Sequence, residues 1–564
     1  MKKPQSNRSK TIKPIGVVLA LGSSATILAG CGNKTTPTTS GKSPTAVFIN
    51  APASPFVDNF NPFSPSNPAV GQGVSEIYEP LFWKNSYTGK YVPKLAVSYA
   101  YNSAHTAITF QLRKNVKWSD GTPFTSADVV YTYDLILSHP ALDLNGLSSM
   151  IASVHANGMY GVTIDLKAPN SADLYFIAAD TPILPKHVWD KIANPVTYTD
   201  RHPVTTGPYL VGSFSSSGFT LVRNRHYWNA PQPYVKTISV PLYLSNNSAE
   251  LAMAKGNYTV AEQFLPDIRR TLLSKNPSDY HYWFPPALNR LIFTNDAKYP
   301  FNITAFRQAL SDAINRQEIS TVGEYGYEPI ANSVFLPPTP LLKKYIDSSI
   351  TTQYPLKYSV SKAKLLLKSA GFHWNRSGNL IDPHGGVVAP TMLVPAGATD
   401  TISDAEIMAK NFKEIGINMT VKTPALSTIL SDLDTGSYQM IFKTAASQGG
   451  PSAYDLYTTY FSKTYYKPVG QSATGNQERW QNAKVNNLLN QYTRTFSSSA
   501  KVSILDQIEK VIAQQLPLIP VVFQPAWDEY NTSSITNFPS AKNPYAAPIY
   551  NWDVEYIMAQ LKVK

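Results

Sequence analysis

The sequence predicts an α/β fold, because strand patterns and helix patterns alternate along the chain. Apolar and polar residues alternate, as in strands, at Thr106–Arg113, Gly161–Lys167 and Gly218–Asn224. Apolar residues recur at helical spacing in Thr304–Ile319, Ser361–Phe372 and Ile504–Leu516. Hydrophobic residues make up 43% of the 564 residues and aromatic residues 12%, which is enough for large cores. A chain of this length suits about three domains.

Residues 1–30 have the pattern of a secretory signal peptide. The segment begins with a basic stretch that contains no carboxylate, and its cations are Lys2, Lys3, Arg8, Lys10 and Lys13. An apolar run follows at Ile15–Leu28. This run is too short to cross a membrane comfortably. The alternative interpretation is an unprocessed amphipathic or membrane helix.

The single cysteine of the chain ends this segment. An internal disulfide is excluded, and Leu28-Ala29-Gly30-Cys31 resembles the bacterial lipobox, whose cysteine is diacylated and becomes the first mature residue. Residues 31–44 are rich in Thr, Ser, Gly and Pro, a composition typical of a flexible tether. We therefore expect Cys31 to bind membrane lipid on the outer face of the bacterial cytoplasmic membrane, with an extracytoplasmic body.

The composition narrows the range of partners. The formal net charge is +12, but the cations are spread along the chain, so nucleic acid is not an expected partner. The 34 Tyr and 9 Trp offer broad apolar faces with polar tips, which suit small amphipathic solutes such as peptides or sugars. Ordinary surface use of Tyr in a large secreted domain is the alternative.

The segment Val116–Leu137 is explained by local structure alone. Ser119-Asp120-Gly121 is a turn sequence, Thr125 is a natural helix N-cap, and Asp128 lies in the first helical turn. No residue in it requires a chemical role.

This segment, "WSDGTPFTSADVVYTYD", nevertheless resembles a hallmark of the family 5 extracellular solute-binding proteins, the oligopeptide, dipeptide and nickel receptors of bacterial ABC importers. Further similar segments follow in the family's order. They are "FVDNFNPFSPSN", "VSEIYEPLFW", "TTGPYLVGSF", "LVRNRHYWN", "FRQALSDAINRQEI", "YSVSKAKLLLKSAGF" and "IEKVIAQQLPLIPVVF". Their shared order from Thr45 onward makes the resemblance specific.

The resemblance implies a two-lobed periplasmic-binding-protein fold of type II, with an extra subdomain in the first lobe. Lobe I is expected at 45–85, 205–289 and 522–564, the extra subdomain at 86–204, and lobe II at 290–521. It also implies a monomer that closes by hinge motion on a small-molecule solute and is recognised by an ABC permease in the membrane.

Three departures from the family pattern stand out. Asn315 and Ser359 replace aspartates, and both remain able to cap a helix. In peptide-binding members, an aspartate after the strand that corresponds to Gly436–Ala446 meets the α-ammonium group of the ligand, but here no carboxylate follows before Asp455. A desolvated ammonium needs a negative partner. We therefore expect poor discrimination between free and N-acetylated peptides.

The resemblance places the candidate ligand-binding residues in three segments. They are Phe60, Asn61, Ser447, Gln448, Tyr454, Asn476, Arg479 and Trp480. The fork of Arg479 would suit a ligand carboxylate, and the rings of Tyr454 and Trp480 would stack on a sugar or cover an apolar side chain. Packing or surface exposure is the alternative for each.

The function predicted from these observations is capture of peptides, with oligosaccharides or another neutral solute as the alternative. No H-E-x-x-H, G-x-S-x-G or P-loop motif occurs, and the nine His lack zinc-ligand spacing. We therefore expect no catalysis, no cofactor and no metal. An exported lipid-anchored hydrolase with a spatially convergent pair of carboxylates is the less favoured alternative.

Overall fold

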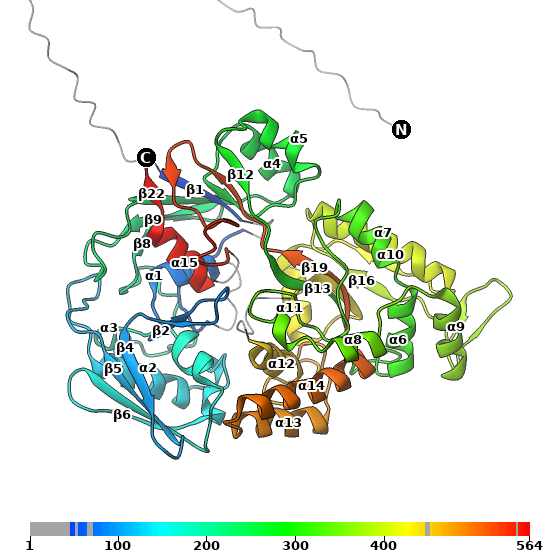
Figure 1. The fold of residues 1–564 in the computed structure, drawn as a ribbon, viewed down its shortest axis with the longest axis horizontal. Coiled ribbons are helices and arrows are strands. Elements are labelled where there is room, and N and C mark those ends of the chain that lie inside the picture. The colour runs from blue at the N-terminus through cyan, green and yellow to red at the C-terminus, as the bar shows by residue number, and fades with distance from the viewer. Residues whose placement is uncertain (1–44, 51–54, 65–70, 446–451, 549–550) are drawn as a thin grey trace, which may run out of the picture. The chain divides into compact units, whose positions relative to one another are not determined.

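The computed structural model describes residues 45–50, 55–64, 71–445, 452–548 and 551–564. Cys31, Ser447 and Gln448 lie outside this described part of the chain. Three larger sheets with helices packed against them organise the described residues, which confirms the predicted α/β class (Figure 1).

A seven-stranded sheet contains the first strand of the described chain. Its order is β12 (Tyr280–Tyr282), β20 (Glu529–Asn531), β11 (Val260–Ala261), β1 (Thr45–Ile49), β10 (Thr237–Pro241), β9 (Gly218–Arg223) and β8 (Tyr209–Ser215). The strand β1 is parallel to β10 and β11, and the other neighbours pair antiparallel. The helix α1 (Gly71–Ile77) contacts both β8 and α15 (Asn551–Gln560).

A five-stranded sheet forms the centre of the second half. Its order is β17 (Thr420–Lys422), β16 (Thr391–Leu393), β18 (Met440–Thr444), β13 (Pro286–Thr294) and β19 (Leu518–Pro525). Ile292 and Phe442 pack with α6 (Thr304–Ala313) and α10 (Thr399–Glu414). Leu291 and Ile441 join the cluster that includes α12 (Ala453–Phe461) and α14 (Ser498–Gln515). Both faces are covered because successive side chains of a strand point to opposite sides.

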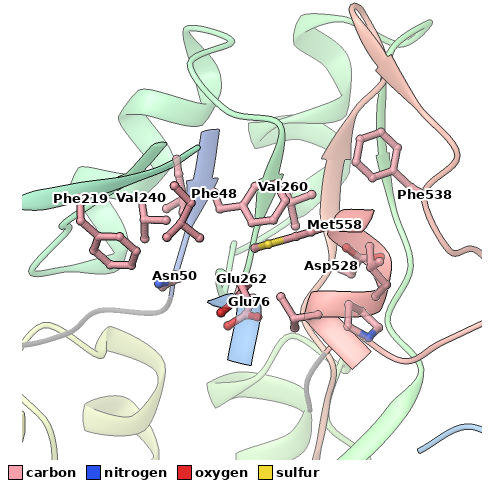
Figure 2. A pocket seen from close by; sticks show the side chains of 15 residues that line it. Phe48, Asn50, Glu76, Phe219, Val240, Val260, Glu262, Asp528, Phe538 and Met558 are labelled. Carbon is pink, nitrogen blue, oxygen red and sulfur yellow. The ribbon is translucent and has the colours of Figure 1, made fainter. Parts of the chain in front are cut away.

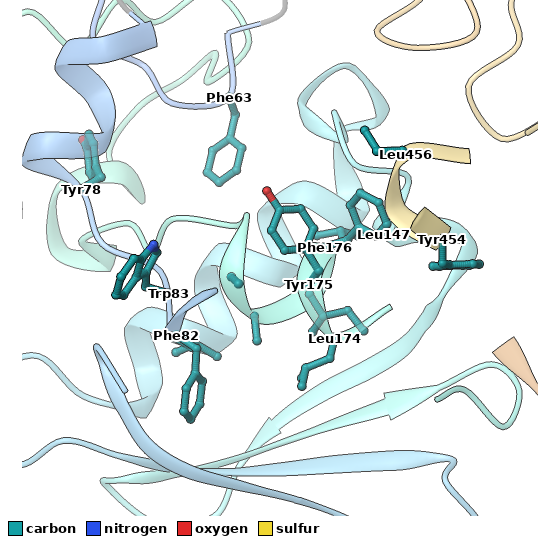
Figure 3. Close-up of a cluster of buried hydrophobic side chains, with 14 of the residues drawn as sticks. Phe63, Tyr78, Phe82, Trp83, Leu147, Leu174, Tyr175, Phe176, Tyr454 and Leu456 are labelled. Carbon is teal, nitrogen blue, oxygen red and sulfur yellow. The ribbon is translucent and has the colours of Figure 1, made fainter. Parts of the chain in front are cut away.

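A four-stranded sheet forms the third layer, in the order β4 (Ala96–Tyr101), β5 (Ala107–Leu112), β7 (Gly161–Leu166) and β6 (Ile151–Ala156). The helix α2 (Ser126–Ser138) packs on β6 and β7. It begins with a capping box in which Thr125 and Asp128 bond each other's backbone N–H groups, as the sequence predicts. The hydrophobic cluster beside this layer also takes in Tyr454 and Leu456 of α12 (Figure 3).

The remaining elements are short or peripheral. The helices are α3 (Lys186–Trp189), α4 (Asn246–Ala254), α5 (Ile268–Thr271), α7 (Arg316–Glu318), α8 (Ser348–Gln353), α9 (Val360–Ser369), α11 (Leu426–Thr435) and α13 (Ala483–Thr493). The strand pairs are β2 (Phe82–Lys84) with β3 (Tyr91–Pro93), β14 (His373–Trp374) with β15 (Leu380–Ile381), and β21 (Ile535–Thr536) with β22 (Lys562–Val563). Single 3₁₀ turns lie at Pro140–Leu142, Leu147–Ser149, Leu273–Lys275 and Lys343–Tyr345, and π turns at Tyr175–Ala179 and Ile319–Gly323.

One predicted helix is interrupted. The pattern at Thr304–Ile319 predicts a single helix, but α6 ends at Ala313 because Ile314 has an extended backbone, with ψ at 119°. Asn315 then caps the short helix α7 by accepting the Glu318 N–H at 3.3 Å. Ser359 caps α9 in the same way through the Lys362 N–H, so both residues that replace the family's aspartates form caps.

The chain crosses between the seven-stranded and five-stranded sheets twice, at residues 283–285 and 526–528. The Ala526 N–H donates to the Pro285 carbonyl at 2.8 Å, and the Trp283 N–H donates to the Asp528 carbonyl at 2.9 Å. The antiparallel pair β13 and β19 continues directly from these bonds, with a register shift at Arg290. The two crossings therefore lie side by side as a bonded pair.

Arg290 on β13 is the centre of a buried ionic group. Its side chain is 3% exposed and contacts four carboxylates, those of Glu324, Glu328 at 3.1 Å, Asp400 at 2.9 Å and Asp404 at 3.6 Å. Burial raises the pKa of Glu324 to about 7 and also raises the pKa values of Glu328 and Asp404. One guanidinium thus joins β13 to the start of α10 and to the turn at Ile319–Gly323.

We expect Arg290→Met to lower the free energy of unfolding by about 3–5 kcal/mol, because it leaves four buried carboxylates without their cation. Urea unfolding at neutral pH measures the loss. Arg270→Met is the matched control, since the Arg270 side chain is 78% exposed and should cost at most about 0.5 kcal/mol. Equal unfolding midpoints for the two variants would show that the ionic group does not stabilise the fold.

Candidate functional site

The carboxyl ends of β1 and β11 lie at the same edge of the seven-stranded sheet, because these two strands are parallel neighbours. Asn50 follows β1, and Glu262 and Gln263 follow β11. The Glu262 N–H donates to the Ile49 carbonyl at 2.8 Å, and the Gln263 side chain donates to the Asn50 carbonyl. In α/β sheets, ligands bind outside the carboxyl ends of parallel strands. This edge is therefore the first candidate site.

A cavity of about 30 Å³ lies at this edge (Figure 2). Most of its lining is apolar and comes from β1, β9, β10, β11 and α15, through residues such as Phe48, Val240 and Met558. Glu76 of α1, Glu262 and Asp528 also line it. The space is large enough for about one group the size of a water molecule.

The carboxylates at this cavity are buried and incompletely paired. Glu76 is 0% exposed and Asp528 1% exposed, and Glu76 Oε1 and Asp528 Oδ2 have no hydrogen-bond partner among the described residues. The neighbouring Glu529 is 0% exposed and accepts the Gln263 N–H through Oε2 at 3.2 Å. Burial raises the pKa values of Glu76, Asp528 and Glu529 well above the ordinary range, and repulsion by Glu262 raises each further.

The cavity adjoins the crossing between the two sheets. Asp528 belongs to the second crossing segment, where its carbonyl accepts the Trp283 N–H. The neighbouring Trp527 ring meets Phe264 and Phe284 edge to face, with centroids 5.8 and 4.8 Å apart. The cavity therefore lies next to the segment that joins the two halves.

The structure places Phe60 and Asn61 inside the region of the seven-stranded sheet. The Phe60 ring is fully buried against Phe214 and Phe219. The Asn61 amide donates to the carbonyls of Pro195 at 3.0 Å and Tyr198 at 2.8 Å, which ties two loops together. Neither side chain lines the cavity.

Tyr454 lies where the two halves touch. Its hydroxyl donates to Asp173 Oδ1 at 2.8 Å, and its ring stacks on Tyr492 with centroids 4.6 Å apart. The adjacent Asp455 forms an ion pair with Lys84 at 2.9 Å. The first carboxylate after the β18 loop is therefore already paired with a cation of the chain.

Asn476, Arg479 and Trp480 lie together, buried beside α11 and α12. The Asn476 amide donates to the Ser462 carbonyl at 3.1 Å and to the Trp480 carbonyl at 2.8 Å. The Nη groups of Arg479 donate to backbone carbonyls, including that of Leu433 at 2.8 Å. The predicted pairing of Arg479 with a ligand carboxylate would have to compete with these bonds.

The structure thus does not bring the eight predicted ligand-binding residues into one cavity. Ser447 and Gln448 lie outside the described residues, so their role stays a prediction, as does the ligand contact of the other six. Glu76, Glu262 and Asp528 were not predicted. A carboxylate directly after a buried strand is a pattern that could have indicated Glu262. The same pattern does not indicate Glu76 or Asp528.

No three His, Cys, Asp or Glu side chains within the described ranges are placed to hold a metal ion. No helix in that part of the chain is both long and apolar enough to cross a membrane.

We expect the stability of the free protein to fall as the pH rises from about 5 to 8. The folded state keeps protons on Glu76, Asp528 and Glu529, whereas the unfolded chain releases them near the ordinary pKa of about 4. Because the folded state binds more protons in this range, each retained proton lowers the free energy of unfolding by about 1.4 kcal/mol per pH unit.

Urea midpoints between pH 5 and 8 measure this slope. Glu76→Gln should flatten it and raise stability at pH 8, and the exposed Glu406→Gln should leave it unchanged. A steeper fall in Glu76→Gln than in the parent protein would contradict the assignment of the proton to Glu76.

Comparison with known proteins identifies the family. A sequence profile of the bacterial extracellular solute-binding proteins, family 5 (Middle), matches residues 90–467, about two thirds of the chain. The glutathione-binding protein GsiB of Shigella dysenteriae serotype 1 is 28% identical over 487 residues, which cover 83% of this chain and 87% of that protein.

Solved structures agree with this match. A periplasmic oligopeptide-binding protein of an oligopeptide ABC transporter from Thermotoga maritima, crystallised with mannohexaose, has a TM-score of 0.86 and 26% identity, covering 93% of this chain and 100% of that one. The oligopeptide-binding protein AppA from Bacillus subtilis, bound to a nonapeptide, shares the fold with a TM-score of 0.78 at 18% identity, covering 92% and 100%. The fold is the predicted two-lobed, type II periplasmic-binding-protein fold, and the chain belongs to family 5 of the bacterial extracellular solute-binding proteins.

Proposed function

We propose that this chain is the receptor of an ABC importer that captures peptides between its two lobes and delivers them to a membrane permease. The family match over residues 90–467 carries the proposal, because members of this family bind solutes for transport. Lobe I is here the part with the seven-stranded sheet, and lobe II the part with the five-stranded sheet. We assign 45–85, 205–289 and 522–564 to lobe I, 86–204 to its extra subdomain, and 290–521 to lobe II.

Closure about the two crossings is the proposed capture step. Opening must break the contacts that join residues assigned to opposite lobes, and four of these contacts serve as examples. They are the Lys84–Asp455 ion pair at 2.9 Å, the Tyr454–Asp173 bond at 2.8 Å, the Asn246–Asp400 bond at 3.1 Å, and the bond from the Ile268 N–H to the Tyr327 hydroxyl at 3.0 Å. Each is short-ranged, so a bound solute with contacts to both lobes would favour the closed arrangement.

Peptides are the first proposed solute class, and oligosaccharides are the second. A peptide backbone can be held by main-chain pairing, which needs no particular side chain and leaves no trace in the sequence. The Thermotoga maritima relative favours the second class, because it was crystallised with mannohexaose although it is described as oligopeptide-binding. Ser447 and Gln448 remain the proposed solute contacts in lobe II. Phe60, Asn61, Tyr454, Asn476, Arg479 and Trp480 are proposed to form the walls around the solute.

We also propose that the body is extracytoplasmic, monomeric and anchored to membrane lipid through Cys31. The order of basic segment, apolar run and Leu-Ala-Gly-Cys supports the anchor. No catalytic step, nucleic acid or cofactor is part of this proposal.

A thermal-shift screen tests the receptor function. We expect a peptide or oligosaccharide that binds to stabilise the protein by about 2.7 kcal/mol at a concentration 100 times its Kd, through mass action alone. The absence of a shift with every peptide and with mannohexaose would count against a receptor. Turnover of chromogenic esters or glycosides would favour the hydrolase instead.

We expect Cys31→Ser to release the body from the membrane fraction, because a serine cannot form the thioether to lipid. Immunoblots of membrane and soluble fractions measure the distribution. Ser24→Ala, a change in the same signal segment that keeps the cysteine, is the matched control and should stay with the membrane. Wild-type partitioning of Cys31→Ser would contradict the anchor.

A further inference from the structure

We infer that Glu76, Glu262 and Asp528 form a subsite in lobe I for a primary ammonium group of the solute. This inference rests on the proposed receptor function and narrows its solute class. The three carboxylates come from α1, from the end of β11 and from the second crossing segment, and they line the same cavity (Figure 2).

Two of these carboxylates have acceptor atoms that nothing in the described chain uses. Glu76 Oε1 and Asp528 Oδ2 are buried without a hydrogen-bond partner, while Glu76 Oε2 accepts the Ser75 hydroxyl at 3.0 Å. An unpaired buried acceptor costs about 1–3 kcal/mol, and more when it carries charge. A molecule that pairs with these two atoms in the cavity would remove that cost.

Glu76 and Asp528 have no cation partner among the ion pairs of the described residues. The buried ammonium group of Lys94 contacts Glu555 at 2.7 Å and Glu79 at 3.7 Å instead. No ion pair of the described chain includes Glu76 or Asp528. The unpaired carboxyl oxygens of Glu76 and Asp528 are therefore available to a cation from outside, whose binding would release the protons that burial holds on these two groups.

Size and chemistry favour a primary ammonium group over other cations. The cavity of about 30 Å³ admits a group the size of a water molecule, whereas a planar guanidinium is much larger. An ammonium group has three donors and no acceptor, which matches a set of carboxylate oxygens. The described residues place no three ligands for a metal ion. The apolar lining excludes water, which strengthens a charge-assisted bond.

The position of the cavity connects this subsite to capture. It lies at the carboxyl ends of β1 and β11, and Asp528 belongs to a crossing segment. An ammonium group bound here would contact Asp528 of this crossing segment, and that contact is the link to capture. This reverses the expectation from the sequence that free and N-acetylated peptides bind alike, because that expectation considered only the loop after β18.

Calorimetry on matched solutes tests the inference. The series contains one short peptide with a free amino terminus, its N-acetylated form, and an N-acetylated form that carries a lysine. We expect the parent protein to bind the free amine at least about tenfold more tightly than the acetylated peptide, since acetylation leaves the carboxylates unpaired. The lysine peptide shows whether a side-chain ammonium group also fits.

Glu76→Gln and Asp528→Asn should each abolish this preference while binding of the acetylated peptide is retained. Two variants keep the test valid if one of them fails to fold. Glu478→Gln is the matched control, because Glu478 is also fully buried and unpaired but lies outside the cavity, and it should keep the preference.

If peptides do not bind, the same comparison is made with glucosamine and N-acetylglucosamine oligosaccharides. A preference for the amine in that series would support the subsite while excluding peptides as the solute. Equal binding of free and acetylated solutes by the parent protein would overturn the subsite but not the receptor. Failure of every amine-bearing solute to bind, with mannohexaose still bound, would do the same.

Discussion

The bonded pair of crossings between β12 and β13 and between β19 and β20 is the constraint on which the rest of the molecule depends. Two backbone hydrogen bonds hold residues 283–285 beside residues 526–528, and the pairing of β13 with β19 extends them into lobe II. Both of these links between the two sheets pass through one narrow ribbon, which is where the proposed closure would have to occur. The register shift at Arg290 locates an irregularity in this ribbon, where strands bend most readily.

Two groups of buried carboxylates flank this ribbon, and they differ in one respect. The lobe II group surrounds Arg290, so its charge is partly balanced within the chain. In the group around the cavity in lobe I, Glu76 and Asp528 take part in no ion pair of the described residues. The group around Arg290 resembles a structural ion cluster, whereas the group around the cavity lowers the stability of the free protein. Residues that lower the stability of the fold are common at binding sites and active sites.

The sequence predicted most of the fold because its signals are local. The alternation of apolar and polar residues located β5, β7 and β9, and the helical spacing of apolar residues located α9 and α14. The majority of the predicted ends lie within a few residues of the observed ones. The interruption after Ala313 was missed because the apolar pattern continues through it, whereas the backbone turns at Ile314. The family was predicted from colinear motifs, which the profile match confirms.

The candidate site was harder to predict for a physical reason. Glu76, Glu262 and Asp528 are far apart in the sequence. Glu262 and Asp528 meet because β11 lies between β1 and β20, and Glu76 joins them from α1, which packs on β8 and α15. The periodicity of apolar residues along the sequence gives no information about contacts between such distant segments. Arg479 shows the opposite difficulty, since a fork that suits a ligand carboxylate also suits backbone carbonyls. Residue type alone does not distinguish these two uses.

The order of strands in the two sheets also has a consequence for how the chain folds. The strand β20 separates β11 from β12 in lobe I, and β19 completes the edge of the lobe II sheet next to β13, so each sheet needs residues beyond 517. Contacts of such long sequence separation form slowly, since loop closure must come before the contacts that repay it. During synthesis, neither sheet is complete until the last tenth of the chain has emerged from the ribosome. Until then β11 and β13 each have an open edge, which is the form most exposed to misassembly and to binding by chaperones.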